Sequence, residues 1–406
     1  MKNPHILPAR ASSPDERLAG SASADNCPRH LYLHIPFCEG KCHYCGFYSV
    51  TADHATHLRH ARLICRELDL SCFRAAPVQT IYTGGGTPGL LGADGFRLLA
   101  AELRQRGVLP QLEEWTVELN PASTNAPMLA TLREIGVTRL SIGAQSFDDA
   151  ILRAIGRCHN AAAIGRAVAL ARTAGFDDYG LDLIAGLPGV TLQMWRETLK
   201  QAVALGCVHI SVYALGIEPG TLLMEQVRGG CAVPSDEAQI EALSLAEEVL
   251  ANAGFERYEI SNYALPGHAC RHNLAVWRGE DYLGLGPSAA SRCGRRRWTN
   301  QADAAGYLGA LEQGHPPPRS EDETLGPEDD ALERFVFGLR LNDWISPAAF
   351  AHRHKVLAYR VPEWEQTLAR LSEQAIVAPT TPPEPRGWRL TTRGREVADA
   401  VIRELI

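Results

Sequence analysis

The sequence lacks the features that would assign the protein to a membrane, to export or to a nucleic acid. None of its segments approaches the ~18 consecutive apolar residues that span a bilayer. The first ~28 residues contain no apolar core of signal-peptide length. Positive charge is not in excess either, because 40 Lys and Arg stand against 47 Asp and Glu, a net charge of −7. We therefore expect a cytoplasmic protein that is not integral to a membrane and has no nucleic-acid partner.

The eleven cysteines do not indicate a disulfide framework. Their number is odd and the sequence shows no export signal, so reduced thiols are expected. Eight of them are scattered along the sequence, which is typical of small buried apolar residues. The other three, Cys38, Cys42 and Cys45, form a C-x3-C-x2-C motif that needs another explanation.

The 406 residues, 45% hydrophobic and 21% charged, have the composition of a globular protein with a sizeable core. Short β-branched or aromatic runs alternate with stretches of helical spacing, which predicts an α/β fold with a parallel sheet. Six or seven such units favour a partial (β/α) barrel over a flat six-stranded sheet. Ligands bind at the carboxyl ends of the strands in either fold. The expected strands are 31–36, 80–83, 115–119, 139–142, 181–185, 209–213 and 257–260.

The sequence also predicts how the chain is divided. A flexible tail is expected over residues 1–29, followed by the partial barrel over 30–314. A proline-rich and acidic stretch over 315–330 predicts a linker. Helical periodicity and one short strand at 388–390 predict a small, mostly helical module with a wing over 331–406.

The three clustered cysteines lie just after the first expected strand. Thiolates bind iron–sulfur clusters or zinc, and closely spaced thiolates can surround one metal centre. A structural zinc ion needs four protein ligands, so a fourth would come from His34, His43, Cys27 or a remote residue. A four-iron cluster held by three cysteines instead leaves one iron open to another ligand. The spacing favours the cluster, with a zinc site or no metal as alternatives.

Other polar residues follow the expected strands at the same edge of the sheet. Residues 83–88 read TGGGTP, in which glycines allow a ligand to approach the backbone, although a plain tight turn is the alternative. An acid inside an apolar strand, as at Asp182, is costly to bury without a partner. Each residue alone is as readily structural as functional. Their joint placement predicts a binding site formed by Glu118, Asn120, Gln145 and Asp182.

Together these motifs resemble the radical S-adenosylmethionine superfamily. Within it, the chain is similar to the oxygen-independent coproporphyrinogen III oxidase family, and most of all to its shorter HemW-type heme chaperone subgroup. The resemblance runs in order from about Leu31 to the C-terminus. It rests on segments 32–38, 83–88, 118–121, 143–147 and 182–189, which read YLHIPFC, TGGGTP, ELNP, GAQSF and DLIAGLPG.

The resemblance implies a role for each motif residue. A [4Fe-4S] cluster would be held by Cys38, Cys42 and Cys45, with S-adenosylmethionine chelating the fourth iron. Tyr44 matches an aromatic position near the adenine, and an aromatic cover that keeps water from the cluster is the alternative. The methionine amino group would face Gly85, Gly86 and Thr87. Further cofactor contacts would come from Tyr32, Glu118, Gln145, Arg157 and Asp182, because carboxylates accept from an ammonium and a guanidinium can hold a carboxylate.

Two departures from the oxidases favour the chaperone subgroup. The oxidases carry a further cysteine two residues after the third, where this chain has Phe47, and they have a longer N-terminal region. Residues 270–277, CRHNLAVW, resemble the chaperones' HNxxYW signature, with Val276 in place of tyrosine. The segment 287–291 replaces one that is usually richer in glycine. The signature implies His272 as a candidate heme ligand, since a neutral imidazole is a common axial donor, with a structural histidine as the alternative.

The function implied is a heme chaperone that passes heme to an acceptor protein and receives electrons from a donor protein. The alternative is a coproporphyrinogen dehydrogenase-like oxidoreductase, in which a 5′-deoxyadenosyl radical drives the oxidative decarboxylation of a porphyrinogen. A structural zinc protein is a third hypothesis from another class. Whether the protein is an enzyme is left open by the sequence.

Overall fold

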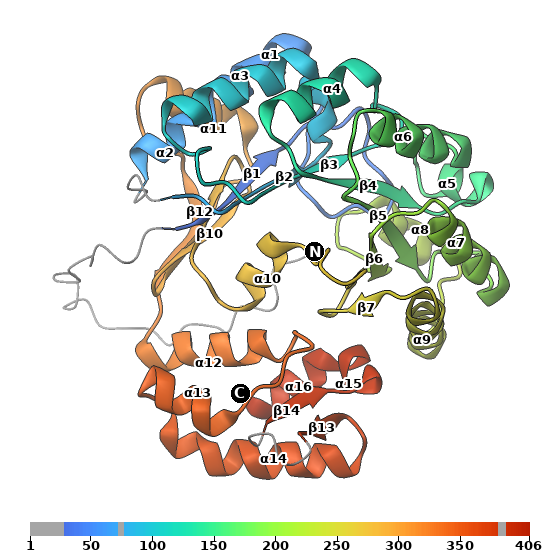
Figure 1. Cartoon of the computed structure of the whole chain (residues 1–406), viewed down its shortest axis with the longest axis vertical. Coiled ribbons are helices and arrows are strands. Elements are labelled where there is room, and N and C mark those ends of the chain that lie inside the picture. Colours follow the sequence, from blue (N-terminus) through green and yellow to red (C-terminus); the bar gives the residue numbers. More distant parts are fainter. Residues whose placement is uncertain (1–27, 72–76, 381–386) are drawn as a thin grey trace.

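The computed structural model describes residues 28–71, 77–380 and 387–406 (Figure 1). Cys27, Cys72 and the expected tail up to residue 27 lie outside these ranges. The strands are β1 His30–Ile35, β2 Thr80–Gly85, β3 Glu114–Leu119, β4 Arg139–Gln145, β5 Tyr179–Ala185, β6 His209–Ala214, β7 Glu256–Arg257, β8 Asn262–Ala264, β9 Tyr282–Leu285, β10 Ala290–Cys293, β11 Arg296–Asn300, β12 Arg319–Thr324, β13 Val377–Pro379 and β14 Trp388–Leu390.

The helices alternate with the strands along most of the chain and then dominate its C-terminal part. They are α1 His54–Leu63, α2 Arg66–Leu70, α3 Gly92–Gln105, α4 Ala126–Ile135, α5 Asp149–Ala154, α6 Ala161–Thr173, α7 Leu192–Ala204, α8 Leu222–Arg228, α9 Asp236–Asn252, α10 Arg271–Trp277, α11 Ala304–Glu312, α12 Pro327–Gly338, α13 Pro347–His354, α14 Val361–Glu373, α15 Thr392–Glu396 and α16 Ala398–Leu405.

One curved sheet organises the larger part of the protein. It has 12 strands in the order β12-β11-β10-β9-β1-β2-β3-β4-β5-β6-β8-β7. The strands from β9 through β1 to β6 are parallel, and the outer strands on both sides pair antiparallel. Helices α1, α3, α4, α6, α7 and α9 cover the convex face, whereas α10 lies on the concave side (Figure 1). The expected α/β fold with a partial barrel and a helical C-terminal region is confirmed.

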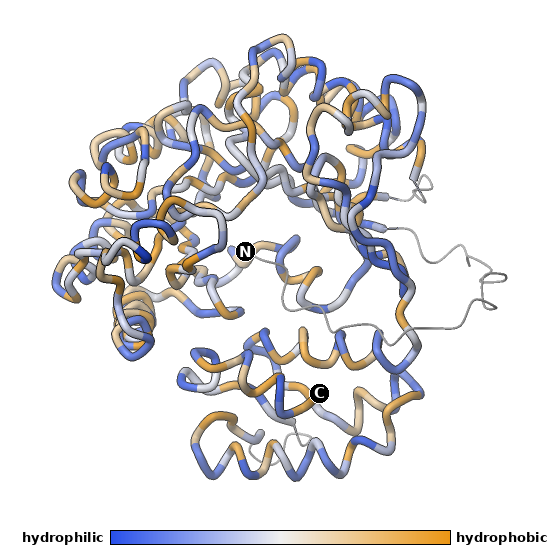
Figure 2. Tube along the Cα trace, turned by 180° about the vertical axis from the view of Figure 1, so that it is seen from behind, coloured by the Kyte–Doolittle hydropathy of each residue, from blue (hydrophilic) through white to orange (hydrophobic). Residues whose placement is uncertain are grey.

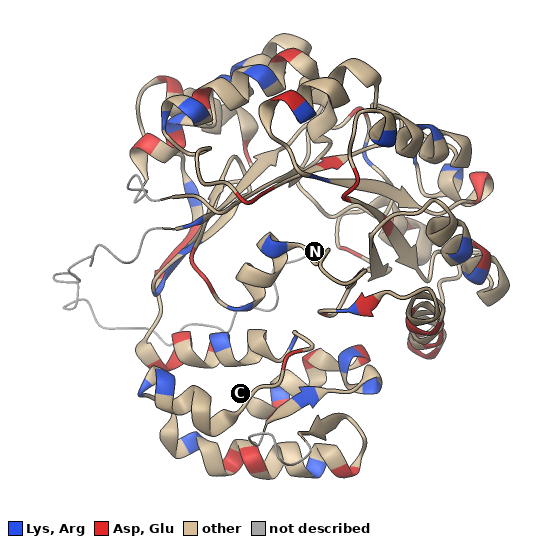
Figure 3. Cartoon of the chain, in the orientation of Figure 1, with Lys and Arg blue, Asp and Glu red and all other residues tan. Residues whose placement is uncertain are grey.

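The core of the barrel lies between the sheet and its outer helices. Leu31, Leu33 and Ile35 of β1 are fully buried there, and so are Trp115 and Val117 of β3. The alternate residues on each strand face the concave side, which follows from the two-residue period of a strand, and among them Tyr32 and Glu118 are partly exposed. Charged residues lie mainly on the helices and loops, so the parallel strands are mostly uncharged (Figure 3).

Side-chain caps fix where several outer helices begin. The side chains of Asn125, Asn160, Thr191 and Ser235 each accept a hydrogen bond from a backbone N–H three residues later. Such caps satisfy a donor that the first turn of a helix leaves free.

The structure corrects two details of the predicted division. Residues 257–260 do not form a seventh parallel strand, because only Arg257 belongs to the short antiparallel β7. The seventh parallel strand is β9, which pairs with β1. The expected linker over 315–330 contains β12 and the start of α12. Strand β12 is hydrophilic throughout (Figure 2) and pairs with β11, where Arg296 and Asp322 form an ion pair of 2.8 Å.

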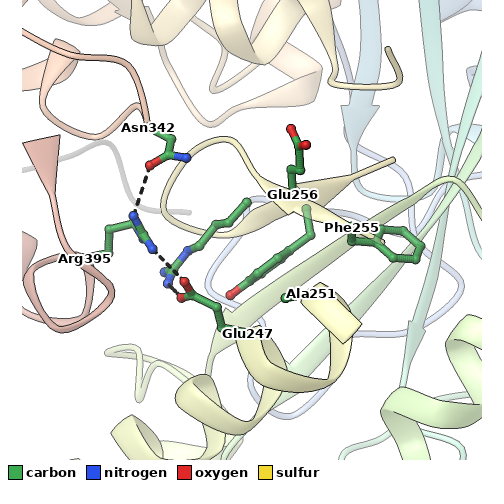
Figure 4. Close-up of a pocket in the computed structure, with 8 residues that line it drawn as sticks. Glu247, Ala251, Phe255, Glu256, Asn342 and Arg395 are labelled. Atoms are coloured by element: carbon green, nitrogen blue, oxygen red, sulfur yellow. Dashed lines mark hydrogen bonds and ion pairs between the residues drawn. The ribbon is translucent and has the colours of Figure 1, made fainter. Parts of the chain in front are cut away.

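The C-terminal module has a core of its own and meets the barrel through charged residues. Phe335 of α12 stacks on Trp364 of α14 at 4.1 Å between ring centroids. On one side, buried Arg292 of β10 pairs with Asp330 and Glu333 of α12. On the other side, Glu247 of α9 joins Arg257 to Arg395 of the module, beside a pocket of about 230 Å³ (Figure 4).

Within the described ranges, no helix is both long and apolar enough to cross a lipid bilayer.

Candidate cluster and cofactor site

The three clustered cysteines lie on the loop that follows β1, at the carboxyl end of the parallel strands. Two backbone hydrogen bonds close the base of this loop, from Cys38 N to Val50 O at 3.0 Å and from Val50 N to Pro36 O at 2.7 Å. A third, from Cys45 N to Cys42 O at 3.1 Å, forms a tight turn. The loop therefore carries all three cysteines in one short segment at this end of the strands.

These thiols have the donor chemistry that an iron–sulfur cluster needs. All three are free and partly exposed. Burial raises the pKa of the Cys45 thiol, and nearby Cys42 and Cys38 raise that pKa further. Among the residues that the structure describes, no three His, Cys, Asp or Glu side chains gather closely enough to hold one metal ion. A four-iron cluster needs no such convergence, because each cysteine binds a different iron.

The glycine turn after β2 packs against β1 and the cysteine loop. A Cβ on Gly84 would lie 2.9 Å from the Glu118 carboxylate, and one on Gly86 would lie 2.5 Å from the carbonyl oxygen of Phe37. Gly85 has a φ of +110°, which favours glycine, and its N–H donates to Glu118 at 3.1 Å. Thr87 Oγ1 lies 3.7 Å from Cys38 Sγ. The turn thus lies against Phe37 with its backbone and against Cys38 with the Thr87 hydroxyl.

Two carboxylates face the concave side of the sheet below this turn. Glu118 of β3 accepts a hydrogen bond of 2.9 Å from Tyr82 Oη, and burial raises its pKa to about 7. Asp182 of β5 accepts bonds of 2.9 and 3.1 Å from Ser141 Oγ, and burial raises its pKa as well. A bound cation near these groups would offset the cost of burying their charge, which suits the ammonium and sulfonium of S-adenosylmethionine.

Arg157 connects the cysteine loop to the end of β4. Its Nη1 donates to Cys42 Sγ at 3.5 Å and its Nη2 to Gly143 O at 2.8 Å. The buried Nε has no hydrogen-bond partner in the described part of the chain, so a donor is left for a bound group. Gln145 lies beside it with a φ of 67°, and the amide Nε2 of Gln145 is 3.1 Å from a Cβ placed on Gly143. The pair can bind a carboxylate at this point of the edge.

Two aromatic residues of the predicted site occupy different parts of it. Tyr32 of β1 bonds to His34 Nδ1 at 3.1 Å, and its ring stacks on Tyr82 at 6.2 Å between centroids. Tyr44 packs against an apolar cluster that includes Ile151 and Leu187. Burial raises the pKa of the Tyr44 phenol. This packing is compatible with either position expected for Tyr44.

His272 lies apart from these residues, at the amino end of the strands. Its Nδ1 is 2.9 Å from Oγ1 of Thr80, the first residue of β2. Its ring is 5.4 Å from that of Tyr82. Burial lowers the pKa of His272 to about 3, so the imidazole is neutral near pH 7. The cluster loop and the candidate heme ligand are therefore at opposite ends of the same strands. Tyr82 lies between Glu118, to which it donates, and the His272 ring.

The sequence did not point to Tyr82, which donates a hydrogen bond to Glu118 and whose ring lies against that of His272. The available signal was the two-residue period of β2, because Thr80, Tyr82 and Gly84 alternate with Ile81 and Thr83. Asn120, also predicted at this edge, lies in the turn after β3, where its Oδ1 accepts from Ala122 N at 3.2 Å.

Comparison with known proteins decides between the families that share this architecture. Residues 32–202 match the Radical SAM superfamily. Heme chaperone HemW of Mycobacterium tuberculosis is 35% identical over 400 residues, which cover 96% of this chain and 97% of that protein. Heme chaperone HemW of Synechocystis sp. is 37% identical over 77% of this chain and 78% of that protein.

The similarity to solved structures agrees with the fold. Coproporphyrinogen III oxidase (HemN) of Escherichia coli, a radical SAM enzyme, aligns with a TM-score of 0.78 at 25% identity. The alignment covers 94% of this chain and 90% of that chain. The oxidase thus shares the architecture, whereas the two heme chaperones above are more similar in sequence, at 35% and 37% identity. On these grounds the chain belongs to the HemW heme chaperone family of the radical SAM superfamily.

Proposed function

We propose that the protein is a heme chaperone that binds heme and passes it to an acceptor protein. The observation that carries this proposal is the 35% identity to a heme chaperone over 96% of this chain. Phe47 supports it, because the oxidases resembled here carry a cysteine at that position. We also propose an electron-donor protein as a partner. A reducing, cytoplasmic location is supported by the free thiols of the nine described cysteines.

The cluster and cofactor would be held at the carboxyl end of the strands. Cys38, Cys42 and Cys45 would ligate the [4Fe-4S] cluster, and Arg157 with Gln145 would hold the carboxylate of S-adenosylmethionine. When bound, the cluster and S-adenosylmethionine supply one-electron chemistry. Arg157 also donates to Cys42 Sγ, which places a positive charge beside a thiolate ligand.

The amino-acid part of S-adenosylmethionine fits the rest of this edge. The Gly85 to Thr87 backbone would face the ammonium, and Glu118 and Asp182 would accept from its cationic and hydroxyl groups. Tyr32 and Tyr44 would enclose the cofactor from two sides. The placement of the turn is supported by its close packing, because Gly84 and Gly86 leave no room for a side chain.

Heme would bind through His272. The imidazole is neutral at physiological pH, and one of its two nitrogens, Nδ1, is already held by Thr80. A neutral ring with one nitrogen held is the usual state of a histidine that binds a metal through the other nitrogen.

The test is a titration of the purified full-length chain with hemin. We expect one hemin per chain, with a dissociation constant that rises at least about tenfold in His272→Ala. His268→Ala is the matched control, because His268 lies four residues earlier and is paired with Asp178 at 3.3 Å. Absence of hemin binding by the unmodified chain would refute the function. Equal binding by His272→Ala would refute the ligand alone.

A further inference from the structure

Four side chains form a continuous hydrogen-bonded chain at the amino end of the barrel. Glu280 Oε2 is 3.1 Å from His30 Nε2, and His30 Nδ1 is 2.8 Å from Thr80 Oγ1. The same Thr80 oxygen is 2.9 Å from His272 Nδ1. The chain runs from half-exposed Glu280 inward to three residues that are each 5% exposed or less.

The chemistry of these groups fixes the direction of every hydrogen bond when both rings are neutral. A carboxylate only accepts, so His30 carries its proton on Nε2 and its Nδ1 is a bare acceptor. The Thr80 hydroxyl must therefore donate to His30 Nδ1. Its oxygen then accepts from His272, which carries its proton on Nδ1.

The consequence appears on the far side of the His272 ring. With the proton on Nδ1, Nε2 keeps a free lone pair. Within the described ranges, the hydrogen bond of the His272 ring to another side chain is made through Nδ1, to Thr80, and Nε2 takes no part in it. The opposite tautomer would place a proton on Nε2 and block metal binding there.

We propose that His30, Thr80 and Glu280 are positioning residues that hold His272 as the Nδ1–H tautomer, with Nε2 ready to bind the iron of heme. The inference rests on the proposed function, because it takes His272 as the heme ligand. It adds three residues that never touch the heme iron.

We call the hydrogen-bonded chain from Glu280 through His30 and Thr80 to His272 the relay. Because its inner residues are buried, the loss of one hydrogen bond in it is costly. Each of the two inner rings and the hydroxyl is shielded from water, so a broken link leaves an unpaired polar atom rather than a solvated one. Hydrogen bonds of this kind orient a ligating imidazole and increase its basicity, and their loss typically costs about 10- to 100-fold in metal affinity. A hydrogen bond that only supported the fold would not change the electronic properties of bound heme.

The test compares Thr80→Val with Thr80→Ser in the full-length chain, with hemin as the probe. We expect Thr80→Val to raise the hemin dissociation constant about tenfold and Thr80→Ser to restore it to within about threefold. In the ferrous heme complex, resonance Raman spectra of Thr80→Val should show a lower iron–imidazole stretching frequency, because Nδ1–H has lost its acceptor. A structural role alone would leave that frequency unchanged.

Two further variants keep the test decisive. Thr116 on the neighbouring strand β3 carries another fully buried hydroxyl, which has no hydrogen-bond partner among the described residues. The Thr116→Val variant should therefore bind hemin like the unmodified chain. Glu280→Ala changes a half-exposed residue and tests the relay even if Thr80→Val does not fold. It should lower the same stretching frequency.

The two proposals fail in different ways. Unchanged affinity and frequency in Thr80→Val and Glu280→Ala, with binding lost in His272→Ala, would overturn the relay and leave the heme ligand intact. Unchanged binding in His272→Ala would overturn the ligand itself.

Discussion

Arg157 Nη1 donates a hydrogen bond of 3.5 Å to Cys42 Sγ, which ties the end of β4 to the middle cysteine of the loop. The same guanidinium keeps a buried Nε without a partner in the described ranges. One residue thus contacts a predicted cluster ligand and has a donor left for the predicted cofactor.

Arg157→Lys should weaken the binding of S-adenosylmethionine while leaving the cluster in place. Lysine keeps the positive charge but loses the planar fork that binds a carboxylate through two parallel bonds. We expect an affinity about tenfold lower by isothermal titration calorimetry, with unchanged iron content. The control is Arg153→Lys on the exposed face of α5, which should bind normally. Equal affinity in the Arg157 variant would contradict the assignment.

Replacing any one of the three loop cysteines with serine should remove the iron–sulfur cluster. The unmodified chain, reconstituted without oxygen, is expected to hold about four irons and to absorb near 400 nm. Cys231→Ser alters an exposed thiol between α8 and α9 and should keep both signals. Zinc without iron in the unmodified protein would instead support the structural zinc hypothesis.

Glu67 should make the stability of the protein depend on pH. Its carboxylate accepts from Gly286 N, Asn300 Nδ2 and Tyr307 Oη, yet burial still raises its pKa from 4.5 to about 7. The native state therefore binds more protons than the unfolded state between these values, and stability falls as the pH rises through this window. The stabilisation lost by about pH 8 amounts to roughly 3 kcal/mol.

Urea unfolding at pH 5 and pH 8 measures this effect. The free energy of unfolding of the unmodified chain should fall between these two values more than that of Glu67→Gln, which cannot ionise. An equal change in the free energy of unfolding between pH 5 and pH 8 in the two proteins would show that Glu67 does not titrate in this range.

Glu247→Ala should loosen the C-terminal module from the barrel. Glu247 pairs with Arg257 at 2.8 Å and with Arg395 at 2.7 Å, and its loss leaves both mostly buried guanidinium groups without this partner (Figure 4). We expect a loss of about 3 kcal/mol in the free energy of unfolding and faster proteolysis between the two parts. Glu248→Ala removes a mostly exposed partner of Arg196 and should cost less than about 1 kcal/mol. Similar losses in the free energy of unfolding in both variants would show that Glu247 does not hold the module to the barrel.

The sequence alone was sufficient for the features that depend on local patterns. The cysteine loop, the glycine turn and six parallel strands follow from spacing and apolar periodicity within short windows. Strand β9 was missed because it has four residues and includes Gly284, which is placed where a Cβ would lie 2.1 Å from Ala290 O. Glycine is depleted in strands, so the short run gave no clear signal.

Features that depend on distant partners could not be predicted from local sequence. Strand β12 was taken for part of a linker because acidic residues dominate it, and its pairing depends on the arginines of β11. Thr80 and His272 are 192 positions apart, so their hydrogen bond has no local signature. His272 likewise lies at the amino end of the strands because α10 packs on the concave side of the sheet, with His272 against Thr80 (Figure 1).

We infer that a radical SAM fold serves here to carry heme rather than to oxidise a porphyrinogen. One experiment separates these two roles: the cluster-loaded chain is given S-adenosylmethionine, a reductant and coproporphyrinogen III, decarboxylated porphyrin is followed by chromatography, and hemin is titrated in parallel. We expect one tightly bound hemin per chain and no decarboxylated product. Decarboxylation of coproporphyrinogen III with repeated turnover, in a chain that fails to retain hemin, would contradict it.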